Sequence, residues 1–156
     1  EKYRQEKLAL VQKVPTPITP MEIDKEHHHI TLAYFEQKST VDYIGNVQGV
    51  PICFDAKECA TDTFPIHNIH EHQLTYMREF EQQNGIAFLI IYFSTVQEYY
   101  YVPFRDVAYF WERAQSGGRK SFRREELDAA YRIKFSNQIY IHYLEMLSKD
   151  LETRDT

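Results

Sequence analysis

Two carboxylates and a lysine in the first third of the chain have the types and spacing of a metal-assisted hydrolytic site. Asp42 precedes Asp55 by 13 positions, and Lys57 follows two residues after Asp55. Residues 52–58 read ICFDAKE, which is apolar and β-branched enough to predict a strand. Because side chains alternate along a strand, Asp55 and Lys57 share one face and the apolar side chains share the other. With Asp42 on the neighbouring segment, the three groups predict a pocket for a hard divalent cation and phosphate chemistry.

The expected chemistry assigns a role to each group. Asp42 and Asp55, with the carbonyl of Ala56, would hold one or two Mg²⁺ ions, for which Mn²⁺ can substitute. Lys57 would orient the attacking water or offset charge on the pentavalent transition state. The alternative is a surface ion pair between Asp55 and Lys57, which would contribute little to stability.

Two further residues are candidates for this site. Thr40 lies two positions before Asp42, on the same face of an expected strand, and could contact a metal-bound water or the phosphate. The preferred interpretation is a strand threonine with no role in chemistry. Gln73 is the only strongly polar member of an apolar row at helical spacing over residues 69–80, so its amide is expected to point inward. A role in substrate contact or support of the site is as plausible for Gln73 as a structural one.

Length and composition indicate one domain of 156 residues with a sizeable core. No apolar run approaches the ~18–20 residues of a membrane span, and no secretory leader is visible. The chain begins at Glu1 without Met, which suggests a piece of something longer. Cys53 and Cys59 are too far apart along one strand to bridge, so a reduced cytoplasmic protein is expected.

The net charge of −5 argues at first against a nucleic-acid partner. Residues 117–124, however, hold four cations and no anion. An acidic nuclease with one basic patch is therefore compatible with the composition, although such a cluster is usually only solvated surface.

The coarse pattern predicts one mixed α/β sheet with interleaved helices. Strands are expected at 31–38, 86–93 and 98–104, the last nearer an edge because of Pro103, with a hairpin over 39–57. Residues 8–14 are expected to form a strand or a helix end. Helices are expected from an N-cap at Asn68 to Asn84, over 107–114, over 122–131 with Ser121 as cap, and over 140–151. Residues 21–30 are polar and read as an excursion from the core.

The histidines do not form a familiar metal pattern. His67, His70 and His72 lack zinc-site spacing, and on a helix His70 and His72 would point in different directions. Solvated or capping histidines are the preferred interpretation. The run His27, His28, His29 is either simply exposed or faces phosphate.

Several segments together resemble one known family. They are VPTP (14–17), AYFEQKSTVDYIG (33–45), ICFDAKE (52–58), FP…NIHEHQ (64–73), EYYYVPF (98–104) and GGRKSF (117–122). In this order they resemble the RecU-type Holliday junction resolvases of Gram-positive bacteria and their phages, within the PD-(D/E)xK nuclease superfamily. The resemblance runs from about residue 8 to 130.

The resemblance implies a restriction-endonuclease-like mixed sheet flanked by helices, a single nuclease domain over 1–156, a homodimer, and a protruding stalk at about 21–35. It places the active site on Asp42, Asp55 and Lys57, supported by Thr40 and Gln73. The expected DNA contacts are Lys25, His27, His28, His29, Tyr34, Phe35 and Lys38 near the stalk, and Arg119, Lys120, Arg123 and Arg124 in the basic cluster. The sequence departs from the family in having Asp55 where Glu is usual, a shorter and His-rich excursion, and no N-terminal Gly- and Glu-containing segment.

The sequence therefore predicts a Mg²⁺-dependent endonuclease that resolves four-way DNA junctions by paired nicks, in a bacterial or phage-infected cytoplasm. A recombinase is a further expected partner. The alternatives are a nuclease for other branched or linear DNA, and a DNA- or recombinase-binding module that has kept the fold without the activity.

Overall fold

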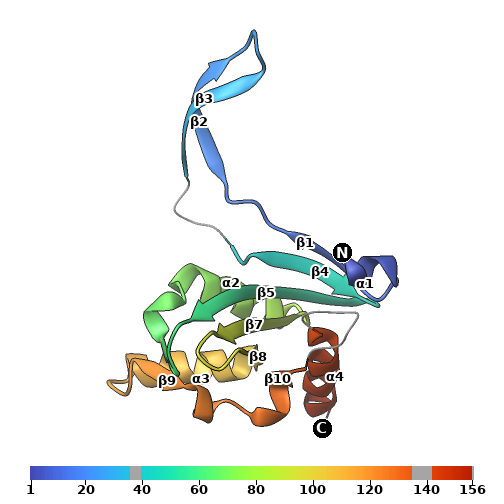
Figure 1. Cartoon of the computed structure of the whole chain (residues 1–156), viewed down its shortest axis with the longest axis vertical. Coiled ribbons are helices and arrows are strands. Elements are labelled where there is room, and N and C mark those ends of the chain that lie inside the picture. The colour runs from blue at the N-terminus through green and yellow to red at the C-terminus, as the bar shows by residue number, and fades with distance from the viewer. Residues whose placement is uncertain (36–39, 135–141, 156) are drawn as a thin grey trace.

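A mixed six-stranded sheet forms the centre of the computed structural model, which describes residues 1–35, 40–134 and 142–155 (Figure 1). The strand order is β1-β4-β5-β7-β8-β10; β5 and β7 pair in parallel, and the other neighbours are antiparallel. This arrangement, with helices on both faces, confirms the predicted α/β fold. The sheet strands are β1 (Leu10–Lys13), β4 (Tyr43–Val47), β5 (Val50–Cys59), β7 (Ile86–Phe93), β8 (Glu98–Pro103) and β10 (Arg132–Ile133). The helices are α1 (Lys2–Gln5), α2 (Glu71–Gln82), α3 (Phe104–Gln115) and α4 (Tyr143–Arg154).

Each face of the sheet carries its own apolar core. On one face, α2 and α3 pack against side chains that include Cys53, Leu89 and Ile91. On the other face, α1 and α4 pack against side chains that include Phe54 and Phe88. Strand β7 is almost wholly buried, as its continuous apolar sequence predicted, because it is covered on both sides.

A separate two-stranded hairpin projects away from the sheet (Figure 1). It consists of β2 (Ile18–Asp24) and β3 (His29–Phe35), joined by a turn over 25–28. Large apolar side chains along it, such as Met21 and Phe35, stay 64% and 73% exposed. The segment predicted to leave the core, 21–35, overlaps this hairpin, which begins earlier, at Ile18.

The predicted helix over 122–131 is wrong. Strand β9 (Ser121–Arg123) pairs with β6 (Thr63–Pro65), and short 3₁₀ turns follow, η2 (Arg124–Glu126) and η3 (Ala129–Tyr131). Phe122 is fully buried and stacks with Phe64 at 5.0 Å and with Phe110 at 4.3 Å between ring centroids. This tertiary packing outweighs the local helical pattern.

One smaller prediction also needs correction. Helix α2 begins after His70 rather than Asn68, because residues 66–68 form their own 3₁₀ turn, η1 (Ile66–Asn68). Strand β8 lies near the edge of the sheet, as predicted from Pro103, and in the described residues the two-residue strand β10 pairs with its outer side at Tyr99 and Tyr100. Within the described ranges, none of the helices has the length and apolar character needed to cross a membrane.

Candidate functional site

The alternation of β5 brings Asp55 and Lys57 together on one face of the sheet. The Asp55 side chain is only 1% exposed, and Lys57 Nζ lies 2.8 Å from Asp55 Oδ2. The Lys57 side chain is 17% exposed, so it pairs with the buried carboxylate while part of it reaches solvent. A buried carboxylate must be paired or hydrogen-bonded. The ion pair is therefore not the freely solvated surface contact of the alternative interpretation.

Asp42 adds the second carboxylate from the position just before β4. Its backbone N–H donates to Asp55 Oδ1 at 2.8 Å, and the backbone N–H of Ala56 donates to Asp42 Oδ2 at 3.4 Å. The pKa of Asp42 is raised, first by burial and then by the neighbouring Asp55 carboxylate, while the Ala56 N–H and Lys57 oppose this shift. The two acids thus lie close enough to feel each other's charge.

Gln73 closes the arrangement from the first turn of α2. Its Nε2 donates to Asp55 Oδ2 at 2.9 Å, and its Oε1 accepts from Lys57 Nζ at 3.1 Å and from the backbone N–H of His70 at 3.3 Å. This orientation of the amide satisfies the carboxylate and the ammonium group together. The Gln73 amide points inward, as predicted from the helical row, and its side-chain partners are Asp55 and Lys57.

Thr40 does not occupy the predicted position on a strand face. Strand β4 begins at Tyr43, which pairs with Lys13, the last residue of β1. The chain after Lys13 contains Pro15, which cannot donate to a ladder, so the pairing stops before Thr40. Thr40 is exposed, and among the described contacts its side chain makes no hydrogen bond to the site.

The donor set fits a hard divalent cation. Asp42 and Asp55 supply carboxylate oxygens. After burial, the charge of Asp55 is the next cause of the raised pKa of Asp42, and a cation between the two would offset that repulsion. In the described residues no group of three or more His, Cys, Asp or Glu side chains forms a complete protein cage. Mg²⁺ commonly binds through one or two carboxylates and completes its coordination with water and substrate phosphate. Two acids, the buried Asp55 and the partly buried Asp42, are therefore as many protein carboxylates as such a site commonly uses.

Comparison with known proteins decides the family. The family model described as RecU, Recombination protein U, matches residues 1–149. The chain belongs to the RecU family. It is 37% identical over 152 residues to the Holliday junction resolvase RecU of Bacillus licheniformis, covering 94% of this chain and 76% of that protein. It is 36% identical over 154 residues to the RecU resolvase of a Geobacillus species (96% and 77% covered) and 39% identical over 146 residues to that of Staphylococcus carnosus (90% and 70% covered).

In this RecU-family chain, the predicted stalk contacts separate into a tip and a base. Lys25 and the three histidines 27–29 lie at the exposed hairpin tip, where Asp24 Oδ2 is 2.8 Å from His27 Nδ1 and 3.8 Å from His29 Nε2. Tyr34 and Phe35 lie at the other end of β3 and are 52% and 73% exposed. Lys38 lies outside the described residues. The hairpin does not contribute to the carboxylate site; it extends away from the sheet that carries it (Figure 1).

The basic cluster also divides into two kinds of residue. Arg119, Lys120 and Arg123 are exposed. Arg124 is partly buried, with Nε 3.3 Å from Asp62 Oδ1 and NH1 3.1 Å from Glu98 Oε2. Only the first three are free of these ion pairs and open to a phosphate backbone. No sequence pattern indicated the acidic partners of Arg124, because Asp62 lies in the loop after β5 and Glu98 begins β8, both far from Arg124 in the chain.

The remaining histidines do not assemble a metal centre. His67 and His70 are exposed, and His72 is partly buried. The rings of His70 and His72 stack with centroids 5.6 Å apart and planes at 7°. The predicted divergence of these two rings is wrong because His70 is the extended N-cap of α2 rather than a helical residue.

Proposed function

We propose that this protein is a Mg²⁺-dependent endonuclease that resolves four-way DNA junctions by paired nicks, with Mn²⁺ as a substitute ion. The supporting observation is the hydrogen-bonded set of Asp42, Asp55, Lys57 and Gln73 in a chain of the RecU family. The relatives named above are Holliday junction resolvases, and the site has the parts that phosphodiester hydrolysis requires.

Each residue of the site has a defined task in this proposal. Asp42 and Asp55 would hold the cation, which supplies a polarised phosphate and a water of lowered pKa when bound. Lys57 Nζ, partly exposed beside Asp55, positions the attacking water or stabilises the added negative charge of the transition state. Gln73 fixes the Lys57 ammonium and the Asp55 carboxylate relative to each other. Thr40 keeps only the role of an exposed neighbour that can contact phosphate or a metal-bound water.

Paired nicks require two active sites, so we propose a homodimer. A four-way junction offers two symmetry-related strands, and a two-fold dimer presents one site to each. The β2–β3 hairpin is the proposed stalk that enters the junction, because a long two-stranded projection beside an active site reads shape rather than base sequence. A recombinase partner and a bacterial cytoplasmic location stay predictions from the family resemblance.

A binding module without activity is the main alternative. It would not need two carboxylates, one of them 1% exposed, around a lysine, since such groups are costly to bury without a use for their charge. The intact set favours the enzyme.

The test is incubation of a synthetic four-way junction and the matched linear duplex with Mg²⁺, Mn²⁺ or EDTA. We expect symmetric nicks in the junction with either ion, no nicks in EDTA and little cutting of the duplex. Binding without cutting under every condition would support the module, and equal cutting of junction and duplex would indicate a general nuclease. A variant in which residues 21–33 are replaced by a short Gly-containing turn should lose the preference for the junction while keeping the fold.

A further inference from the structure

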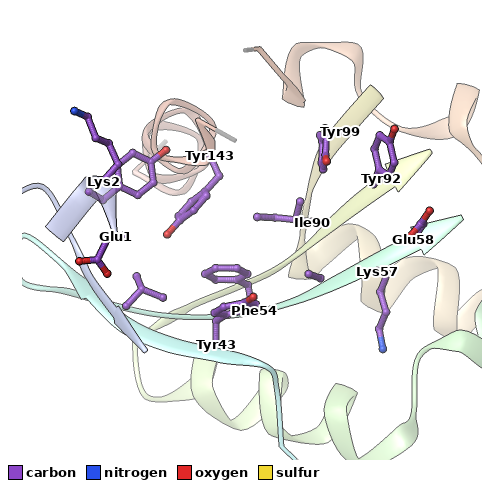
Figure 2. Close-up of a pocket in the computed structure, with 13 residues that line it drawn as sticks. Glu1, Lys2, Tyr43, Phe54, Lys57, Glu58, Ile90, Tyr92, Tyr99 and Tyr143 are labelled. Carbon is purple, nitrogen blue, oxygen red and sulfur yellow. The ribbon is translucent and has the colours of Figure 1, made fainter. Parts of the chain in front are cut away.

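A hollow lined by tyrosines lies on the face of the sheet opposite the Asp55–Lys57 pair (Figure 2). Its volume is about 560 Å³, within the range of pockets that hold small ligands. The floor includes Ala56 of β5 and Ile90 of β7. Ala56 is exposed, and its small side chain fills little of the hollow. Helices α1 and α4 cover the rest of this face but not the stretch beyond Phe54.

Aromatic rings form the walls on two sides. Tyr92 and Tyr99 stack with centroids 4.4 Å apart and planes at 25° on one side. The ring centroids of Phe54 and Tyr143 are 5.1 Å apart on the other side, and Figure 2 shows the two pairs on either side of Ile90. Flat rings on opposite walls suit a flat aromatic ligand, since nucleobases stack on such side chains whatever their sequence.

Charged side chains lie at both ends of the hollow. Glu58 lies at the Tyr92 end, and Glu1 and Lys2 lie at the opposite end (Figure 2). The charge of Glu58 contributes to the raised pKa of Tyr99 after burial and Tyr92. A carboxylate accepts hydrogen bonds from the exocyclic amino groups of cytosine, adenine or guanine, but thymine has no such group, and a phosphate beside Glu58 would be repelled. The charge at the Glu58 end therefore favours a base rather than the backbone.

The hollow and the candidate active site lie on opposite faces of one stretch of β5. Asp55 and Lys57 point to one face, Ala56 and Glu58 to the other, and Lys57 points away from the ring cluster in Figure 2. In the described register, β4 pairs with β5 only as far as Phe54, so this stretch borders an edge of the sheet on the side of Asp42. A DNA strand whose phosphate is held at Asp42 and Asp55 would pass around this edge for the neighbouring base to enter the hollow.

From these observations we infer that the hollow receives an unstacked nucleobase carrying an exocyclic amino group, from the strand being cut, and so selects where the junction is nicked. This inference rests on the proposed nuclease function. Unstacking a base is least costly where pairing is already disturbed, as at a branch point. The junction shape then brings the strand to the site, and the hollow chooses among positions along it.

The first test compares cleavage sites on mobile junctions with each of the four bases next to the nick. The wild-type protein should disfavour thymine at one flanking position by about tenfold, the effect of losing one directional contact to a base. Glu58→Gln should reduce this preference against thymine, and Tyr92→Leu should abolish it. Both variants should bind the junction within about twofold of the wild-type affinity. Glu112→Gln and Tyr109→Leu on exposed positions of α3 are the matched controls and should retain the wild-type preference.

A second test does not depend on cutting. Junctions with photoreactive 5-bromocytosine at each position around the branch point are bound without divalent cation and irradiated. We expect a cross-link to Tyr92 or Tyr99 at one position, which Tyr92→Leu weakens. Cross-links elsewhere, or none, would overturn the inference, as would wild-type cutting without a base preference or with a preference that both hollow variants keep.

The outcomes separate the two proposals. A cross-link in the hollow without cutting under any ion would refute the nuclease and keep the base site. Normal cutting with no base effect would refute the base site alone. If the hollow variants instead change the oligomeric state, measured by light scattering, the face is a contact between copies of the chain and the inference fails.

Discussion

Gln73 Nε2 donates a hydrogen bond to Asp55 Oδ2 at 2.9 Å, deep in a site where Asp55 is 1% exposed. The amide oxygen of the same side chain accepts from Lys57 at 3.1 Å. The carboxylate and the ammonium are thus joined both directly and through Gln73. We conclude that Gln73 is a positioning residue, since it touches the two proposed catalytic groups and holds both in one geometry.

Replacing Gln73 by Ala should slow cutting about 10- to 100-fold with junction affinity nearly unchanged. The reason is that Lys57 and Asp55 lose a shared partner, and misplaced catalytic groups lose rate rather than binding. Single-turnover cleavage and a binding isotherm without divalent cation measure the two effects separately. Gln73→Glu would place a third carboxylate beside Asp55 and should also slow cutting.

Gln82→Ala is the matched control for Gln73→Ala, because Gln82 is exposed on the same helix. It should cut at the parent rate. A purely structural role for Gln73 would be indicated if Gln73→Ala lowered the melting temperature but cut normally at a temperature where it is folded.

Asp42→Asn and Asp55→Asn should each reduce cutting by at least about 100-fold, since each removes a negative ligand from the proposed cation site. Junction binding without divalent cation should stay nearly intact, because neither change alters the hairpin or the basic cluster. Nicking assays with Mg²⁺, paired with gel-shift titrations in EDTA, measure both properties. Cutting at the parent rate by either variant would remove that carboxylate from the mechanism.

The strand alternation of residues 52–58 was predictable because it depends only on local pattern. The hairpin over 39–57 was predictable for the same reason, and Gln73 was marked by its polarity in an apolar row. The exposure of Ala56 could not be predicted from the sequence, because it depends on how much of the sheet α1 and α4 cover. The failure at 122–131 has the same origin, since Phe122 is held by Phe64 and Phe110 from distant segments.

Asp150→Asn should destabilise the fold by about 3 kcal/mol at pH 7, the scale of breaking a buried ion pair. Asp150 is fully buried on α4 and accepts from Tyr101 at 2.6 Å, Arg105 at 2.5 Å and Arg154 at 3.0 Å. These contacts join α4 to β8 and α3, so the change leaves two arginines without their shared acid. Urea unfolding measures the loss, and the exposed Glu152→Gln on the same helix is the control.

The loss in Asp150→Asn should also depend on pH with a definite sign. Burial opposes ionisation, but hydrogen bonds from Arg154, Tyr101 and Arg105 outweigh it, so the pKa of Asp150 is below its ordinary 3.8. A lowered folded pKa gives stability that is complete above the unfolded value and is lost as the pH falls through the folded one. The difference in unfolding free energy between wild type and variant should therefore be constant from pH 7 to about 5 and should decrease below pH 4. If this difference in unfolding free energy instead decreased near pH 6, the pH dependence would belong to a group other than Asp150.

Neutralising Arg119, Lys120 and Arg123 together should flatten the salt dependence of DNA binding. The slope of log affinity against log salt should decrease by about 1 for each phosphate contact removed. Arg124→Gln should change this slope little, because Arg124 is already paired with Asp62 and Glu98. Affinities at several salt concentrations, without divalent cation, give the slopes. An unchanged slope in the triple variant would exclude the cluster from the interface.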